Sequence, residues 1–471
     1  MLSTTSLWLT LTLWDWGIFL LTVLLTLLAA VYGVYVKKSN TINHKKDNIN
    51  SSWAEYILMG RRLTLPLFVA TLVATWYGDI LGVTQIAFQY GVYTFLTQGI
   101  FWYISYILFA IFLARYIRRM QILSFPELFS KLVGAGPGKF SAILIFIKTL
   151  PVTYAIGIGI FLKTLFPISF PIAVSIGLIF VFIYSLFGGF RAIVFSDLVQ
   201  AICMYLGIIL VVIISFLKFG GINYLVLHCP PSHFKFYGSF SVLDTFVWFF
   251  IAISTTFLNP TFYQRCLSAQ TDRVAIRGIF VSIFCWIVFD ICTTLIGLYA
   301  RAYLPSVEPL NASLYYCLYI LPHGLKGLFL GAVLATILST LDSFLFISST
   351  TLMYDLKFMQ SKSRFLSHLA ASLITGIFTF SIVICYKGNF EMAWRLLKGV
   401  FAACIFPPFI LSCFKPHSIS TRLFTWSCLC VLIGMLIWNF SKPLPIDAFY
   451  IGQSISWLIL GIGIMKKQFR I

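Results

Sequence analysis

Four aspartates lie inside, or at the ends of, long apolar stretches of this 471-residue sequence: Asp79, Asp197, Asp290 and Asp342. An acidic side chain at the centre of a bilayer costs about 2.5–3.5 kcal/mol on insertion scales, so such residues usually bind a cation, carry a proton or pair with another helix. Asp197 has two candidate partners, because it could pair with Arg191 across a loop or face Asp342 and share an ion or proton with it. We interpret Asp290 as protonated or hydrogen-bonded between helices.

Hydroxyl side chains repeat at helical spacing within residues 324–356. Thr336, Ser339, Thr340 and Ser343 are three or four residues apart, which places them on one face of a helix. Sodium is a hard cation, and hard cations bind several oxygen atoms. Paired hydroxyls on one helix and free carbonyls on a broken helix would supply these oxygens. Alternatively, such small residues only allow close helix packing and bond back to their own helix.

Residues 67–91 carry Gly78 and Asp79 in the middle of an apolar run. Glycine weakens a helix by about 1 kcal/mol relative to alanine. We therefore predict a broken span whose free carbonyls and carboxylate face a binding cavity, as in many transporters. The alternative is a kinked helix with one satisfied polar residue. The similar run WFFIAISTTFLNP at 248–260 predicts a second break in a span of opposite orientation, which indicates an inverted repeat.

The composition predicts where these elements lie. Hydrophobic residues make up 60% of the chain and charged residues 10%, with a mean hydropathy of +0.95. This balance excludes a soluble domain and predicts an all-α integral membrane protein in a lipid bilayer. The formal net charge is +19, but the charges lie in short loops, so no nucleic-acid partner is expected. We predict about thirteen transmembrane helices, at 14–36, 65–87, 93–115, 140–163, 169–187, 195–217, 241–259, 276–300, 324–350, 366–386, 391–411, 422–440 and 447–465.

Loop charge predicts the topology. With the N-terminus outside, most of the 33 Lys and Arg residues fall in cytoplasmic segments, as the positive-inside rule requires, and the C-terminus is cytoplasmic. Residues 1–13 contain no Lys or Arg, which favours a retained first span over a signal peptide. We expect a single membrane domain in the cell (cytoplasmic or inner) membrane. It comprises an extra N-terminal helix and cytoplasmic loop at 1–64, a first repeat at 65–217, a second repeat at 241–411 and two C-terminal helices at 412–471.

Four motifs, in order along the chain, resemble those of the sodium:solute symporter family. They are RRLTLPLFVATLVATWYGDILG at 61–82, SFPELF at 124–129, GGFRAIVFSDLVQ at 188–200, and the pair YQRCLSAQTDRVAIRG at 263–278 and GLKGLFLGAVLATILSTLDS at 324–343. The third is quite specific, because it is very similar to the family's G-G-x-x-A-V-x-x-T-D-x-x-Q signature. The resemblance implies the five-plus-five inverted-repeat fold of the leucine transporter, with broken second and seventh helices.

The same resemblance implies a sodium site between the second and ninth spans. Carried over residue by residue, it takes the backbone carbonyls of Ala74, Tyr77 and Thr336 and the hydroxyls of Ser339 and Thr340. These two hydroxyls belong to the helix face that the residue spacing indicates. Sodium is therefore the expected cofactor.

Two further sets of residues follow from the resemblance. Asp197 matches an acid that in some relatives helps to hold a second sodium, and Asp342, followed by Ser343, stands where such relatives can have a hydroxyl. These three residues could hold a second cation or a proton. The chain is shorter between Trp76 and Gly82 than sugar-transporting relatives, so the alignment of the preceding acid is open. The expected substrate contacts are Asp79, Gln98 and, at the break of the seventh span, Ser254, Thr255 and Thr256.

The expected function is sodium-coupled symport of a small organic solute into the cell by alternating access. Carriers in this family take proline and other amino acids, pantothenate, sugars or sialic acids, so the solute stays open, as does the oligomeric state. The alternative is a solute sensor or channel on the same scaffold, although after KKQFRI no room remains for the cytoplasmic kinase of some sensors. An enzyme is not expected, because HExxH, GxSxG, Walker and zinc-cluster motifs are absent from the sequence.

Overall fold

The structure is a computed structural model that describes residues 10–41, 49–186, 188–238, 242–358, 363–385, 390–441 and 447–468. Within these ranges it contains helices and one isolated backbone bridge, between Leu63 and Ala269, but no strand. The predicted all-α fold class is therefore confirmed.

The helices follow one another with short connections. The N-terminal part and the first predicted repeat contain α1 (Leu13–Thr41), α2 (Ile49–Leu58), α3 (Leu65–Ala74), α4 (Ile80–Tyr90), α5 (Phe101–Phe109), α6 (Arg115–Arg119), α7 (Phe125–Leu132), α8 (Ala135–Thr149), α9 (Val152–Leu165), α10 (Phe170–Ser185) and α11 (Gly189–Phe219). The remainder contains α12 (Ile222–His228), α13 (Val242–Phe257), α14 (Pro260–Ser268), α15 (Asp272–Tyr303), α16 (Pro309–Ile320), α17 (Leu325–Thr350), α18 (Arg364–Cys385), α19 (Phe390–Phe414), α20 (Thr421–Ser441) and α21 (Ala448–Gln468). Short π-helical segments flank α5, as η3 (Phe95–Ile100) and η4 (Ala110–Ala114), and extend α17, as η6 (Thr351–Asp355).

The number of membrane spans differs from the prediction. Among the described residues, 9 helices are long and apolar enough to cross a membrane, and the bent pair Thr245–Phe257 and Pro260–Ser268 raises the number to 10. The predicted spans at 65–87, 169–187 and 391–411 correspond to shorter apolar helices. The count of thirteen is therefore not confirmed. For the span at 65–87 the reason is physical, because its helix is interrupted after Ala74.

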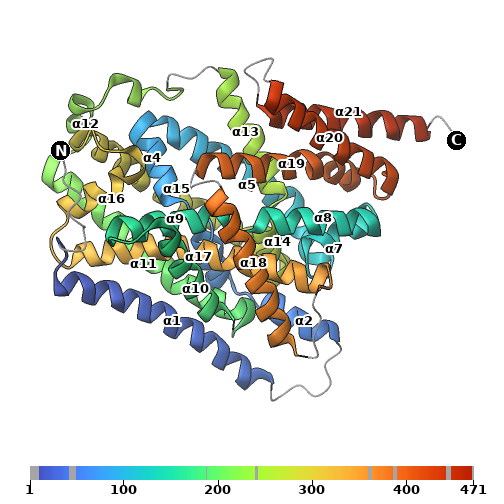
Figure 1. Cartoon of the computed structure of the whole chain (residues 1–471), viewed down its shortest axis with the longest axis horizontal. Coiled ribbons are helices and arrows are strands. Elements are labelled where there is room, and N and C mark those ends of the chain that lie inside the picture. Colours follow the sequence, from blue (N-terminus) through green and yellow to red (C-terminus); the bar gives the residue numbers. More distant parts are fainter. Residues whose placement is uncertain are drawn as a thin grey trace.

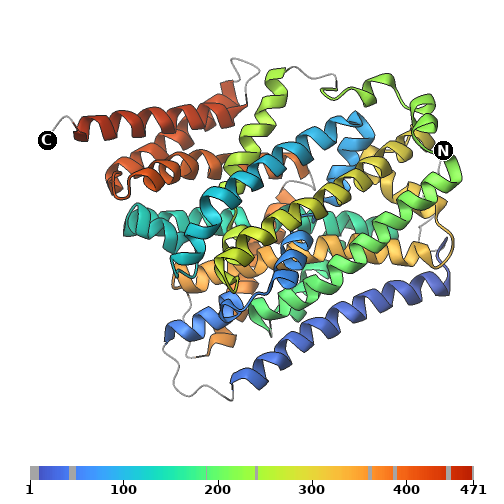
Figure 2. The ribbon, with the colours of Figure 1, turned by 180° about the vertical axis from the view of Figure 1, so that it is seen from behind.

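Helix α17 lies at the centre of the molecule. The most apolar window of the span Leu325–Asp355 is 100% buried, whereas those of α1 and α20 are each 28% buried. Figure 1 shows α1 along one edge, α20 and α21 along the opposite edge, and α17 between them, and Figure 2 shows the same separation from behind. Large apolar side chains of α1, such as Leu20 and Leu28, are exposed, as expected of a surface that contacts lipid.

The first predicted helix break is present. α3 ends at Ala74, α4 begins at Ile80, and the residues between them are not helical. Asp79 caps α4, because its carboxylate accepts a hydrogen bond from the Gly82 N–H at 3.2 Å. A cap of this kind satisfies one of the N–H groups that a helix start leaves unpaired. The prediction of a broken span, rather than a kinked helix, is therefore confirmed.

The second break is also present but begins later than predicted. α13 ends at Phe257, and α14 begins at Pro260 with a bend of 42° between them. Proline lacks the N–H that would continue the helix, and Asn259 caps α14 by accepting a hydrogen bond from the Thr261 N–H at 3.0 Å. The prediction that Ser254, Thr255 and Thr256 occupy this break is wrong. They belong to the end of α13, because the proline, and not the hydroxyl-rich run, interrupts the helix.

The two broken helices are joined by backbone hydrogen bonds. The Leu63 N–H, just before α3, donates to the Ser268 carbonyl at the end of α14 at 2.9 Å. The Gln270 N–H returns a bond to the Leu63 carbonyl at 3.0 Å. The start of one broken helix is thus fixed against the end of the other, which brings both breaks into the interior beside α17.

Candidate functional site

Two hydroxyls of α17 meet free carbonyl groups at the end of α3. Ser339 Oγ donates to the Ala74 carbonyl at 2.8 Å, and Thr340 Oγ1 donates to the Thr75 carbonyl at 2.9 Å. These carbonyls are available because the last carbonyls of a helix have no partner within it. The same two hydroxyls lie 3.1 and 3.3 Å from the Thr336 carbonyl of α17. Oxygens from the two helices therefore form one cluster.

This cluster consists of neutral oxygens in a fully buried place. Ala74, Thr336, Ser339 and Thr340 have no exposed surface, and Thr75 is also buried. In membrane proteins, carbonyl and hydroxyl oxygens at close quarters replace the hydration shell of a monovalent cation. The chemistry of the cluster thus fits sodium better than a transition metal, which would prefer nitrogen or sulfur ligands.

Two residues predicted for the cation site are placed differently from each other. Thr336 offers its carbonyl to the cluster, since its own hydroxyl donates to the Val333 carbonyl at 2.6 Å. Tyr77 lies further along the break, and its hydroxyl donates to the Trp286 carbonyl at 3.2 Å. The carbonyl that Thr340 contacts belongs to Thr75, which the sequence analysis missed. Which carbonyl is free depends on the residue at which α3 ends, and the sequence alone indicates only the region of the break.

A buried arginine occupies the space next to the cluster. Arg265 on α14 is completely buried, and its Nη2 donates to Thr71 Oγ1 at 3.0 Å, Thr75 Oγ1 at 2.7 Å and Ser343 Oγ at 2.8 Å. The same atom lies 3.5 Å from Asp197 Oδ2. Arg265 therefore connects α14 with α3, α11 and α17. Sequence analysis missed this role, although the residue lies in the QR motif quoted above.

The structure decides between the alternatives for Asp197. Arg191 pairs with Glu55, at 2.7 Å, so the predicted pairing of Arg191 with Asp197 is wrong. Arg191 points to α2 because that helix covers the start of α11. Asp197 instead accepts a hydrogen bond from Thr71 Oγ1 at 2.5 Å and pairs with Arg265.

Asp342 is the second acid of this buried group. It accepts a hydrogen bond from the Tyr184 hydroxyl at 2.8 Å and lies close enough to Asp197 and Arg265 for their charges to interact. In the described part of the chain, one oxygen of each acid, Oδ1, is buried without a hydrogen-bond partner. Two acids and one arginine would carry a net charge of −1 if all were ionised. A charge buried in this way is normally compensated by a proton or a cation.

The predicted substrate residues lie on three elements. Asp79 is at the start of α4, and Gln98 is a partly buried residue of the π-helical segment η3. π-helical segments often occur at functional sites. Ser254 donates to the Phe250 carbonyl of its own helix at 2.7 Å, whereas Thr256 Oγ1 is buried with no hydrogen-bond partner among the described residues.

The remaining acid inside a span has a structural partner. Asp290 on α15 accepts a hydrogen bond from the Tyr103 hydroxyl on α5. The prediction that it is hydrogen-bonded between helices is therefore confirmed.

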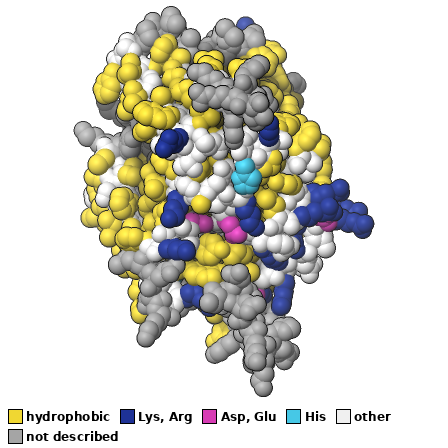
Figure 3. Space-filling view, turned by 90° about the vertical axis from the view of Figure 1, so that its right-hand side faces the viewer, with side chains coloured by type: hydrophobic (Ala, Val, Ile, Leu, Met, Phe, Trp, Pro, Cys, Tyr) yellow, Lys and Arg dark blue, Asp and Glu magenta, His cyan; other side chains and the backbone are white. Residues whose placement is uncertain are grey.

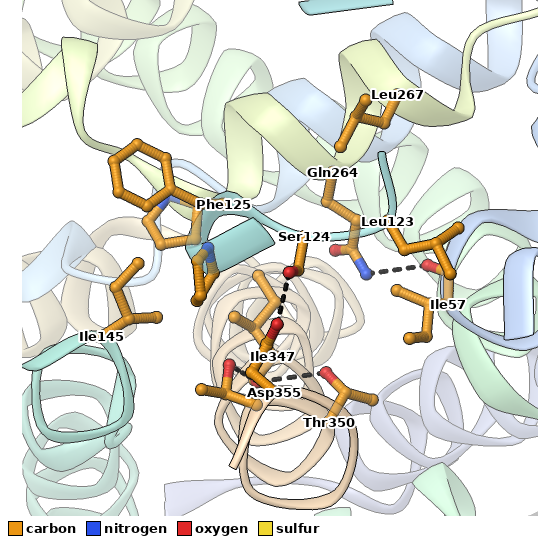
Figure 4. Close-up of a pocket in the computed structure, with 13 residues that line it drawn as sticks. Ile57, Leu123, Ser124, Phe125, Ile145, Gln264, Leu267, Ile347, Thr350 and Asp355 are labelled. Carbon is orange, nitrogen blue, oxygen red and sulfur yellow. Dashed lines mark hydrogen bonds between the residues drawn. The ribbon is translucent and has the colours of Figure 1, made fainter. Parts of the chain in front are cut away.

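A small cavity of about 30 Å³ lies at one end of α17, away from the oxygen cluster (Figure 4). Its polar lining includes Ser124, Gln264 and Asp355, and Ser124 Oγ donates to Asp355 Oδ1 at 2.5 Å. The Gln264 amide donates to the Ile57 carbonyl at 3.1 Å. This volume is enough for about one or two water molecules. The cavity is lined by other residues than the predicted substrate contacts.

Comparison with known proteins identifies the family. A sequence model of the sodium:solute symporter family matches residues 56–420. The chain belongs to the sodium:solute symporter family. The matched range includes both broken helices and α17, so the symporter's oxygen cluster lies in the part of the chain that carries the family pattern.

Several curated relatives of this symporter are sodium-dependent transporters. The sodium/pantothenate symporter of Escherichia coli is 25% identical over 395 residues, which cover 79% of this chain and 80% of that protein. The Haemophilus influenzae protein of the same name is 25% identical over 236 residues, about half of either chain, 47% and 49%. The high-affinity choline transporter 1 of Drosophila melanogaster is 24% identical over 84% of this chain and 66% of its own length. These relatives are transporters and not enzymes.

A solved structure confirms the fold. A sodium-coupled sialic acid symporter in a substrate-bound outward-open state superimposes with a TM-score of 0.78, covering 96% of each chain at 15% sequence identity. The nucleobase-cation-symport-1 transporter MHP1, in a closed conformation, matches with a TM-score of 0.57 at 12% identity. The chain thus has the leucine-transporter-like inverted-repeat fold that the motifs imply.

Proposed function

We propose that this protein moves a small organic solute into the cell together with sodium. Family membership supports sodium as the coupling ion. The observation that carries the proposal is the contact of Ser339 and Thr340 with the free carbonyls of Ala74 and Thr75. Those four oxygens and the Thr336 carbonyl are proposed to hold the ion, with the Tyr77 carbonyl as a further candidate.

The proposed site explains how the ion could drive transport. An ion held between α3 and α17 links a broken helix to the central helix, so its binding or release changes how tightly the two are held together. In transporters with inverted repeats, one helix group rocks against another around a fixed central site. Each sodium ion that enters the cell releases about 2.3 kcal/mol per 100 mV of membrane potential. This energy is available for accumulation of the solute.

The buried acids are proposed to bind a second cation or a proton. Asp197, Asp342 and Ser343 surround Arg265, and the arginine compensates only one of the two acids. The unpartnered Oδ1 atoms of both acids support the presence of a further positive charge during the cycle.

Asp342→Asn tests this second charge. We expect the charge moved per solute to fall by about one elementary charge, because the amide cannot carry a proton or hold a cation by charge. The measurement is the ratio of current to solute uptake in the same proteoliposomes. Asp290→Asn is a matched control inside another span and should leave the ratio unchanged. An unchanged ratio in both variants would contradict a role of Asp342 in coupling.

Gly78→Ala tests the close approach of the break to α17. A Cβ on Gly78 would overlap the Thr340 side chain and the Tyr154 ring. Overpacking costs about 1–3 kcal/mol, so we expect a roughly tenfold or larger rise in the sodium concentration for half-maximal uptake. Gly376→Ala on α18 is the control, because an added Cβ there meets no atom within 4 Å. Equal behaviour of the two variants would contradict the proposed packing.

The solute and its contacts are also proposals. The named relatives carry pantothenate, choline, proline or sialic acid, which are all small organic solutes. Asp79, Gln98, Ser254, Thr255 and Thr256 are proposed as contacts, since they lie at or near the two breaks or on the adjoining η3 segment.

The protein is a multi-pass membrane protein, and we propose that its C-terminus is cytoplasmic and its N-terminus outside. Figure 3 shows Lys and Arg side chains gathered on one end of the molecule, the right-hand end of Figure 1, where α7 lies. Arg115 and Arg119 of α6 expose 60% and 69% of their side chains. Positive loops normally stay in the cytoplasm, which supports this orientation and a location in the cell (cytoplasmic or inner) membrane.

Uptake into proteoliposomes tests the function as a whole. Purified protein is reconstituted and given an inward sodium gradient, a potassium gradient or none, and solutes are screened by accumulation. The expected result is accumulation of at least one solute above its external concentration with the sodium gradient alone. Passive equilibration that ignores the sodium gradient would instead indicate a channel.

A further inference from the structure

Lys148 is a buried cation near the middle of a membrane span. It belongs to the last turn of α8, within the span Ala135–Leu165, and only 7% of its surface is exposed. A lysine in such a place is costly and normally faces a cavity or a partner. The predicted function does not yet use this residue.

The ammonium group of Lys148 lies at the second helix break. Its Nζ donates to the Leu258 carbonyl at 3.0 Å, between α13 and α14, and lies 4.2 Å from the centre of the Phe401 ring on α19. A carbonyl dipole and an aromatic face each offer partial negative charge. Three elements therefore surround the ammonium: α8, α19 and the break itself.

The span that carries Lys148 also reaches the first break. Tyr154 on α9 lies against Gly78, and the Gly157 position faces the Gly78 carbonyl at 3.9 Å. Lys148 and Tyr154 are six residues apart, which corresponds to about 9 Å along a helix. One span thus runs past both breaks, and a small solute bound between them would be within reach of the ammonium.

A second polar group near the break is also unused. Thr256 Oγ1, two residues before Leu258, is completely buried and has no hydrogen-bond partner in the described ranges. A buried hydroxyl without a partner is uncommon and suggests a ligand or a water. An ammonium and a hydroxyl together suit a carboxylate, which accepts several charge-assisted hydrogen bonds.

We infer that Lys148, with Thr256, binds a carboxylate group of the transported solute at the break between α13 and α14. The solute is then an organic acid or a zwitterion, and not a neutral sugar or a simple organic cation. This inference rests on the proposed symport function and adds the chemical class of the solute. Lys148 replaces part of the solute's hydration with one ion pair, and the Leu258 carbonyl holds the ammonium in place.

A purely structural role makes a different prediction. A cation at the C-terminal end of a helix stabilises it by interaction with the helix dipole, so Lys148 could simply hold the end of α13. Its loss would then lower the melting temperature equally with and without any solute. The inferred role instead changes the preference between a charged solute and its uncharged analogue.

The experiment uses solute pairs that differ in one charge. The melting temperature of the purified full-length protein is measured in sodium with L-proline or L-prolinamide, pantothenate or panthenol, and L-lactate or L-lactamide. We expect at least one acid to raise the melting temperature and its uncharged partner not to do so. Lys148→Gln should weaken binding of that acid at least tenfold, Lys148→Arg should retain much of it, and Thr256→Val should weaken it less than Lys148→Gln. Lys163→Gln, an exposed lysine of the same span, is the matched control.

The outcomes separate this inference from the proposed function. If a neutral or purely cationic solute binds and is taken up with sodium, the inference fails and the symport function stands. If an acid binds through Lys148 but its binding and uptake ignore sodium, the inference stands and the symport function fails. Sodium stabilisation without a shift from any acid, or an acid shift that survives in Lys148→Gln, overturns the inference. If Lys148→Gln does not fold, Lys148→Arg and Thr256→Val still test it through the acid-to-amide preference.

Discussion

Thr340→Ala raises the sodium concentration required for half-maximal uptake by about ten- to a hundredfold. The reason is the loss of one of two hydroxyls that meet the α3 carbonyls, at 2.9 Å in the case of Thr340. Interactions between a charged group and a polar partner contribute about 1.5–3 kcal/mol, and each 1.4 kcal/mol corresponds to about tenfold in affinity. The variant keeps the Cβ that packs against Gly78, so the effect should be specific to the oxygen.

Three further variants define this expectation. Thr340→Ser keeps the hydroxyl and should retain most of the sodium affinity, and Ser339→Ala should behave like Thr340→Ala. Thr336→Val is the matched control, because the Thr336 hydroxyl is already bonded to the Val333 carbonyl and only its main-chain carbonyl faces the cluster. The measurement is sodium-dependent uptake over a range of sodium concentrations. If Thr340→Ala and Thr336→Val shift the sodium dependence equally, the ion site lies elsewhere.

Arg265→Gln should have the largest effect on the stability of the protein. Arg265 is the partner of Asp197 and donates to hydroxyls on α3 and α17, all in a completely buried place. Removal of one partner from a buried ion pair costs about 3–5 kcal/mol, because the other charge stays buried without compensation. We expect a much lower melting temperature in detergent and loss of uptake.

A double variant distinguishes charge from size in this expectation. Arg265→Gln combined with Asp197→Asn removes both charges, so it should be more stable than Arg265→Gln alone. Arg119→Gln is the surface control, because its partner Asp272 is exposed to solvent and exposed pairs contribute little. A double variant no more stable than the single one would mean that the arginine acts through packing and hydrogen bonds rather than through its charge.

The sequence alone determined the parts of this protein that depend on neighbouring residues. The apolar composition requires a membrane, and the three- and four-residue spacing places Ser339 and Thr340 on one helix face. Gly78 and Asp79 indicate an interrupted helix because both disfavour a helix within a bilayer. The family motifs add the order of the helices, and the structure confirms these local features.

Only the tertiary structure decided which distant groups meet. Arg265 reaches Asp197 because the joined ends of α3 and α14 bring the QR motif beside α11, whereas Arg191, nearer in sequence, is drawn to Glu55. The position of Thr75 at the cation site likewise depends on the last helical residue of α3. Such contacts join residues more than a hundred positions apart, and their partners are selected by helix packing in three dimensions rather than by any local pattern.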